Sequence, residues 1–309
     1  MVDSIASIDG TTEDTPIVHI SDIHGYLSEA RSALLAVGEI DPFPPIVTVD
    51  ENITLVAPNG ATLAAPSDVP YNSDSITIQS GTTPTINGFA FDGARFGDDS
   101  AAIEINGNAS PTLEDITIRP LESSASGGYD SGISARETTG DWEIHNSTIQ
   151  GAGQSYLGGV GASSSSGEWV IQNTSITGTS QGVDARKASG EWHIRNSIIE
   201  DTDGDGVYAY QTTGAWTISE TIIINSTYSI DRDRNASAVY ADDATTEGDA
   251  RYNYWGASDG PSGEFSGSGD GVIGNVTVSP YYEDRALTEF ASFADGENAS
   301  VSVDIENST

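Results

Sequence analysis

Five side chains that can contact a sugar recur at equivalent positions of a short repeated segment, Gly-Ile/Val-x-Ala. They are Asp184, Arg186, Tyr208, Tyr210 and Tyr240. Tyrosine rings stack on flat apolar surfaces such as sugar faces. Aspartate and arginine form strong hydrogen bonds with hydroxyls or carboxylates. These residues are therefore predicted to bind a ligand. The alternative is an ordinary solvated face on which tyrosine pairs stabilise neighbouring strands.

Carboxylates suggest two further kinds of chemistry. Hydrolysis of a glycosidic bond needs two carboxyl groups about 5–10 Å apart, and Asp184 and Asp205 are the candidate pair. A lyase would need a basic residue at the sugar instead. Acidic turns could also bind Ca²⁺ through oxygen ligands, although such turns arise easily in a chain this acidic. The turns contain Asp201, Asp203, Asp205, Asp231 and Asp233.

A third candidate site lies near the N-terminus. Residues 17–25 read Ile-Val-His-Ile-Ser-Asp-Ile-His-Gly, which resembles the opening motif of the calcineurin-like metallophosphoesterases. The resemblance implies that Asp22 and His24 would ligate one of two catalytic metal ions. The family's later motifs, Gly-Asp-x-x-Asp-Arg and Gly-Asn-His, do not occur in this chain. We therefore expect a vestigial segment that holds no divalent metal and has no phosphoesterase activity.

A sequence repeat predicts the strands that position these residues. The motif Gly-x-Trp-x-Ile occurs four times, with its tryptophans 27, 23 and 24 residues apart at Trp142, Trp169, Trp192 and Trp216. A Gly-Ile/Val-x-Ala segment precedes each copy. Short strands at this period, separated by small and polar turn residues, are typical of a solenoid whose coils share one core. Strands of adjacent coils would stack about 4.8 Å apart.

Alternation along the strand predicts which side chains face inward. Tryptophan, isoleucine and the asparagine that follows them share one face. The tryptophans are therefore expected to form a column in or near the core rather than a sugar-binding platform. The asparagines Asn146, Asn173 and Asn196 are expected to form an internal ladder from coil to coil.

The repeat resembles the right-handed parallel β-helix of pectate-lyase-like proteins. Residues 50–120 contain degenerate earlier coils, and residues 253–281 resemble the closing segment of NosD-like and carbohydrate-binding surface proteins. The sequence thus predicts an all-β, right-handed parallel β-helix solenoid with a short α/β segment at its N-terminus. Residues 1–48 are assigned to the phosphoesterase-like segment, 49–285 to the β-helix and 286–309 to a C-terminal strand segment. We expect the chain to be cut at both ends.

Composition narrows the possible partners. The net charge is −36, from 47 acidic and 11 basic residues, and Lys187 is the one lysine. This excess argues against nucleic acid and anionic membranes, which both attract basic surfaces. Acidic, lysine-poor surfaces resemble those of halophilic proteins. The absence of cysteine excludes disulfides and thiolate metal sites. No apolar run reaches the length of a membrane span, and no secretory signal opens the sequence.

Glycosylation sequons suggest an exported protein. Nine of the fifteen asparagines begin an Asn-x-Ser/Thr sequon, which suits a glycosylated surface. The alternative is that turn chemistry and repetition place asparagine beside serine and threonine. The nine are Asn52, Asn108, Asn146, Asn173, Asn225, Asn235, Asn275, Asn298 and Asn307.

Together these observations predict a monomeric β-helix protein of the cell surface or extracellular space, with a cytoplasmic location as the alternative. It would bind polysaccharide or cell-envelope glycans without catalysis. A polysaccharide lyase or glycoside hydrolase on the same coil is the second hypothesis. A metal-dependent phosphoesterase, suggested by residues 17–25, is the third.

Overall fold

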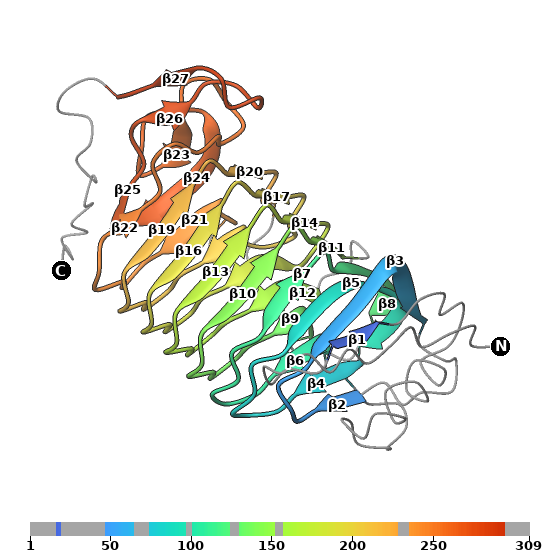
Figure 1. The fold of residues 1–309 in the computed structure, drawn as a ribbon. Helices are drawn as coiled ribbons and strands as arrows, with labels where there is room; N and C mark the ends of the chain where they lie inside the picture. Colours follow the sequence, from blue (N-terminus) through green and yellow to red (C-terminus); the bar gives the residue numbers. More distant parts are fainter. Residues whose placement is uncertain are drawn as a thin grey trace.

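The computed structural model describes residues 17–19, 47–64, 74–96, 101–123, 130–151, 157–227 and 235–293. Figure 1 shows their strands stacked side by side along one axis, from the blue strands near the N-terminus to the orange strands near the C-terminus. Neighbouring strands in the stack pair in parallel, and β26 with β27 is the antiparallel exception. The described residues contain no helix, and so no helix that could span a membrane.

One side of the stack is a ten-stranded sheet, here called sheet B. Its strands follow one another in the order of the coils, so each strand pairs with its counterpart about one repeat away. In spatial order they are β2 (Val47–Val49), β4 (Ile76–Ile78), β6 (Ala101–Ile105), β9 (Asp130–Ser134), β12 (Leu157–Gly161), β15 (Gln181–Asp184), β18 (Val207–Tyr208), β21 (Val239–Ala241), β24 (Gly269–Gly274) and β23 (Pro261–Gly263).

The other sheet, sheet A, has fifteen strands in two rows that meet at β5 (Thr85–Phe96). The first row carries the tryptophans and comprises β7 (Thr112–Glu114), β10 (Trp142–His145), β13 (Trp169–Gln172), β16 (Trp192–Arg195), β19 (Trp216–Ser219), β22 (Gly248–Asp249) and β25 (Val276–Thr277). The second row comprises β8 (Thr117–Ser123), β11 (Thr148–Gln150), β14 (Ser175–Thr177), β17 (Ile198–Glu200) and β20 (Ile222–Ile224).

A central coil therefore contributes one strand to sheet B and two to sheet A, as β15, β16 and β17 illustrate. This is the all-β parallel β-helix solenoid that the repeat predicted. At the N-terminal end, β1 (Ile17–His19) pairs in parallel with β3 (Thr54–Ala64), which pairs with β5. At the other end, β26 (Tyr281–Tyr282) and β27 (Phe290–Ala291) form a small hairpin. Most of the α/β segment predicted for residues 1–48 lies outside the described residues.

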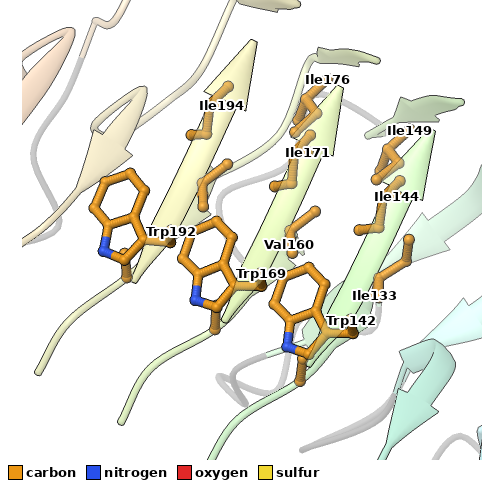
Figure 2. Packing of buried hydrophobic residues seen from close by; sticks show 14 of the residues in the cluster. Ile133, Trp142, Ile144, Ile149, Val160, Trp169, Ile171, Ile176, Trp192 and Ile194 are labelled. Carbon is orange, nitrogen blue, oxygen red and sulfur yellow. The ribbon is translucent and has the colours of Figure 1, made fainter. Parts of the chain in front are cut away.

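The tryptophans form a column inside the coil, as predicted. Trp142, Trp169, Trp192 and Trp216 pair in exact register and are at most 2% exposed. Their ring centroids lie 4.9–5.0 Å apart and their planes are within 4° of parallel. Figure 2 shows three of these rings beside equally regular columns of isoleucine. The core is thus continuous from coil to coil.

The asparagine prediction was wrong in one respect, because these residues face solvent rather than the core. Asn146, Asn173 and Asn196 are exposed and have φ values of 51°, 52° and 48°. Asparagine tolerates this left-handed conformation better than most residues. The chain bends there between its two strands of sheet A, so the two-residue alternation ends at the bend. An exposed hydrogen bond of 3.1 Å joins Asn173 Nδ2 to Asn146 Oδ1.

The internal ladder is formed by the residue after each bend. The Ser147 N–H donates to Thr174 Oγ1 at 3.4 Å, and the Thr174 N–H donates to Ser197 Oγ at 3.2 Å. The Ser197 N–H continues the series to Thr221 Oγ1 at 3.4 Å. Each hydroxyl in turn donates to the carbonyl two residues before it. Buried hydroxyls thus satisfy the backbone at the bends, where no regular strand pairing is available.

Candidate functional site

The outer face of sheet B carries one column of side chains that runs along the stack. Strand register places its members directly beside one another on successive coils: Thr77, Glu104, Ser134, Gly161, Asp184, Tyr208, Tyr240 and Ile273. The residues between them, such as Val183 and Val207, face the core. The column therefore changes from polar to aromatic along the axis.

All five residues predicted to bind a ligand meet on this face. Arg186 and Asp184 form a two-point ion pair, with Nε 3.0 Å from Oδ1 and Nη2 2.7 Å from Oδ2. The Asp184 side chain is 9% exposed and that of Arg186 is 32% exposed. The guanidinium carbon of Arg186 lies 5.4 Å from the ring centre of Tyr208, within range of a cation–π interaction.

Three tyrosine rings extend this surface. The ring centroids of Tyr208 lie 6.0 Å from Tyr210 and 5.6 Å from Tyr240, and those of Tyr210 and Tyr240 are 6.2 Å apart. The hydroxyl of Tyr240 donates to Asp242 at 3.0 Å, and that of Tyr210 donates to Asp243 at 3.3 Å. These contacts fix the rings before any ligand arrives. We call Tyr208, Tyr210 and Tyr240 the tyrosine cluster.

The candidate catalytic carboxylates are on adjacent coils but have structural partners. Asp184 is held by Arg186 as described, and Asp205 is 1% exposed and accepts the Ser237 N–H at 2.9 Å. In the register of β15 with β18, Asp205 lies opposite Gln181. It is therefore three positions from Asp184 along the strand, or roughly 11 Å between backbones given a rise of about 3.3 Å per residue and a coil spacing of about 4.8 Å.

A second polar cluster, which the sequence reasoning missed, lies further along the same column. Burial raises the pKa of Glu104 to about 7; the nearby charge of Asp74 adds to the rise, while Ser134 and Arg136 lower the pKa. Burial also raises the pKa of Asp74, although its Oδ1 accepts the Ala101 N–H at 2.8 Å. A carboxyl with a pKa near 7 can donate or accept a proton at neutral pH.

Arg136 supplies the positive charge of this cluster. Its Nη2 donates to Ser131 Oγ at 3.3 Å, and its side chain leans over the next coil, where Gly161 has no side chain. A Cβ built at Gly161 would lie only 3.1 Å from Arg136 Nε. The sequence signal for this site was the Ile103-Glu104-Ile105 segment, in which a carboxylate stands between two fully buried isoleucines.

Metal binding remains a prediction. The described residues contain no group of three or more His, Cys, Asp or Glu side chains placed to hold a metal ion. Asp201 is exposed and accepts a hydrogen bond of 2.8 Å from Asn225 Nδ2. Asp203 follows it in the same turn. Four residues of the predicted metal sites lie outside the described part of the chain: Asp22, His24, Asp231 and Asp233.

Comparisons with known proteins bear on the fold. No family model and no curated protein matches the sequence. Among solved structures, the chain is similar to a crystal structure of the pectate lyase Pel9A, with a TM-score of 0.45, 16% identity, and coverage of 77% of this chain and 65% of that one.

Two further structures are similar at lower scores. XylC in complex with xylose has a TM-score of 0.42 at 12% identity, covering 79% of this chain and 44% of that one. The Dettilon tailspike protein has a TM-score of 0.36 at 10% identity, covering 86% and 62%. The chain thus spans less than two thirds of each. Identities this low concern the fold alone, and the parallel β-helix of this chain rests on its own strand register.

Proposed function

We propose that this protein is a non-catalytic, monomeric β-helix that binds neutral polysaccharide or cell-envelope glycans along the outer face of sheet B. The observation that carries the proposal is the tyrosine cluster beside the Asp184–Arg186 pair. Three rings with planes 8–23° apart, two on one coil and one on the next, offer an aromatic surface of the kind on which sugar faces stack. The ion pair beside them offers hydrogen-bond donors and acceptors for hydroxyls.

The negative charge of the protein favours a neutral polysaccharide over a polyuronate as the ligand. The net charge of −36 repels polyanions. Arg186, the cation beside the tyrosine cluster, already shares its charge with Asp184. A uronate carboxylate would have to compete with that internal partner, whereas a sugar hydroxyl can join the pair without displacing it.

Affinity electrophoresis in gels containing xylan, mixed-linkage β-glucan, galactomannan or polygalacturonate tests the proposal. At least one neutral polymer should retard the wild-type protein, and Tyr210→Ala and Tyr240→Ala should each weaken binding about tenfold, which corresponds to about 1.4 kcal/mol. Tyr252→Ala is the matched control, because Tyr252 is 41% exposed and packs on Phe290 away from the cluster. Unretarded wild-type protein, or equal losses in all three variants, would contradict the proposal.

A catalytic alternative is favoured by Glu104. A carboxyl with a pKa of about 7 beside Asp74 and Arg136 has the properties of a proton donor for glycosidic cleavage. If the protein is a hydrolase or lyase, the same polymers should yield new reducing ends or unsaturated products, and Glu104→Gln should remove that activity. Product formation that depends on Glu104 would replace the non-catalytic proposal.

An extracellular or cell-surface location, with glycosylated sequons, completes the proposal. The seven sequon asparagines in the described part of the chain are all exposed, as glycosylation requires. They are Asn52, Asn108, Asn146, Asn173, Asn225, Asn235 and Asn275. Mass spectrometry of protein purified from its native source, before and after enzymatic deglycosylation, should show a mass loss. An unmodified native mass would reject the glycosylation.

A further inference from the structure

A cavity of about 410 Å³ lies at the C-terminal end of sheet B. Ile273 belongs to its lining, and Ile273 pairs in register with Tyr240. The cavity is thus the next feature along the column after the tyrosine cluster. Its volume falls within the range of small-molecule sites. The polar residues of its lining are Ser226, Asn235, Ser237, Ser262 and Asp270.

Asp270 gives the cavity its hydrogen-bonding character. Burial raises the pKa of this carboxyl, while hydrogen bonds from the backbone of Ser226 and Asn225 and from the Ser226 side chain lower it. The Ser226 backbone nitrogen lies 2.8 Å from Oδ2. A carboxylate can accept about four hydrogen bonds, so Asp270 retains capacity for one hydroxyl donor. Among the described residues of the lining, Asp270 carries a negative charge, which disfavours an anionic ligand.

Gly271 leaves the middle of this cavity open without being required by the backbone. Its φ is outside the left-handed region, and a Cβ added there would meet nothing closer than 3.8 Å, the nearest atoms including Ser237 Oγ and Ser262 Oγ. Gly263 and Gly269 differ, because a Cβ would lie 2.5 Å and 2.4 Å from backbone carbonyl oxygens. The fold explains those two glycines. The absent side chain at Gly271 is explained by the space it leaves between two hydroxyls.

We propose that this cavity binds the terminal neutral sugar unit of the glycan chain that lies on the tyrosine cluster. Asp270 accepts one of its hydroxyls, Ser237 and Ser262 contact others, and Ile273 packs against its apolar face. Binding is therefore directional, with a chain end in the cavity and the following units on Tyr240 and Tyr208. The claim that the bound sugar is the end of a polymer rests on the proposed function. The claim that the cavity binds a sugar rests on the cavity alone.

Saturation-transfer NMR with free xylose, glucose, galactose, mannose and glucuronate tests the cavity directly. At least one neutral sugar should receive magnetisation and glucuronate should not. Gly271→Leu should abolish the transfer by filling the cavity, and Asp270→Asn should weaken it. Tyr252→Ala should leave it unchanged. Thermal unfolding and Gly271→Ala, whose methyl group fits, control for misfolding. Transfer to no neutral sugar, or transfer that survives Gly271→Leu in a folded protein, overturns the proposal.

The same Gly271→Leu variant in the polysaccharide gels tests the link to the chain end. Binding should weaken at least tenfold if the cavity holds the end of the bound chain. If Tyr240→Ala abolishes polymer binding but Gly271→Leu leaves it intact, the chain-end inference fails and the proposed function stands. If free sugar binds in the cavity but no polymer is retarded, the proposed function fails and the chain end falls with it.

Discussion

Glu104 stands at a position that other coils give to threonine, serine, glycine, aspartate, tyrosine or isoleucine. Its neighbours along the column are Thr77 and Ser134, and burial at this place removes much of the hydration of the carboxyl. The desolvation is the largest cause of its raised pKa. The pKa of a residue on the outer face of sheet B thus depends on the residues of the neighbouring coils.

The raised pKa of Glu104 makes the stability of the protein depend on pH. Its folded pKa of about 7 exceeds the ordinary value of 4.5, so folding favours the protonated form. The loss of stability caused by ionising the buried Glu104 is absent below about pH 4.5, grows as the pH rises and is complete above pH 7. Glu104→Gln should therefore raise the free energy of unfolding at pH 8 by roughly 2–3 kcal/mol and change it little at pH 4.5.

Urea unfolding of both proteins at the two pH values measures this difference. Glu168→Gln serves as the control, because Glu168 is an exposed carboxylate on the Gly-x-Trp turn. A Glu104→Gln effect that is the same at both pH values would show that the carboxyl is not held protonated by the fold.

The turns before the tryptophans show how one residue can disturb an element. In two coils the indole N–H donates to a hydroxyl four residues earlier, Trp142 to Thr138 at 3.3 Å and Trp169 to Ser165 at 3.1 Å. The next coil has Ala188 at this position, and Trp192 Nε1 has no partner among the described residues.

The following coil also has an indole N–H without a hydroxyl acceptor among the residues that the structure describes. Thr212 donates its hydroxyl across to Ala185 O at 2.9 Å, rather than to the carbonyl of its own turn as Ser165 does. Trp216 Nε1 likewise has no partner within the described part of the chain. A missing hydroxyl in one turn therefore accompanies two unsatisfied indoles in the column.

Ala188→Ser should supply the missing acceptor and raise the free energy of unfolding by about 1–2 kcal/mol, since a buried unsatisfied donor costs that much. Ser165→Ala should lower it by a similar amount. Thermal unfolding of the two variants, supported by a crystal structure of Ala188→Ser, checks both signs. A destabilised Ala188→Ser protein would mean that the turn has no room for the hydroxyl.

Sequence pattern was a reliable guide within strands and failed at bends and in the degenerate coils. Alternation placed Trp169 inward and Asp184 and Tyr208 outward on one face, because strand geometry alone decides this. It misplaced Asn173, because a left-handed residue breaks the alternation in a way that hydrophobicity does not reveal. Glu104 was missed because the early coils lack the repeat that would have aligned it with Asp184. The C-terminal cavity needed the register of β23 with β24, which no local pattern predicts.

The whole chain carries a net charge of −36. A net charge this far from zero destabilises the folded state through self-repulsion. At molar ionic strength the screening length falls to about 3 Å, so added salt relieves most of this repulsion.

Urea unfolding at pH 7 should therefore show a midpoint that rises from low salt to molar KCl. The same titration near the isoelectric point of about 4.1 is the control, since the net charge there is close to zero. Stability that is independent of KCl at pH 7 would indicate that the carboxylates are already compensated by local partners.

The column of parallel indoles also makes this protein report optically on its own integrity. Four chromophores with centroids 4.9–5.0 Å apart and planes within 4° of each other have strongly coupled electronic transitions. The near-ultraviolet absorption of the folded protein should therefore be lower than that of four separate indoles, a property that belongs to the stack and to no single tryptophan. Separation of any two adjacent coils among the four that carry these tryptophans interrupts that coupling, so the signal reports on the interfaces between those coils during partial unfolding without an added label.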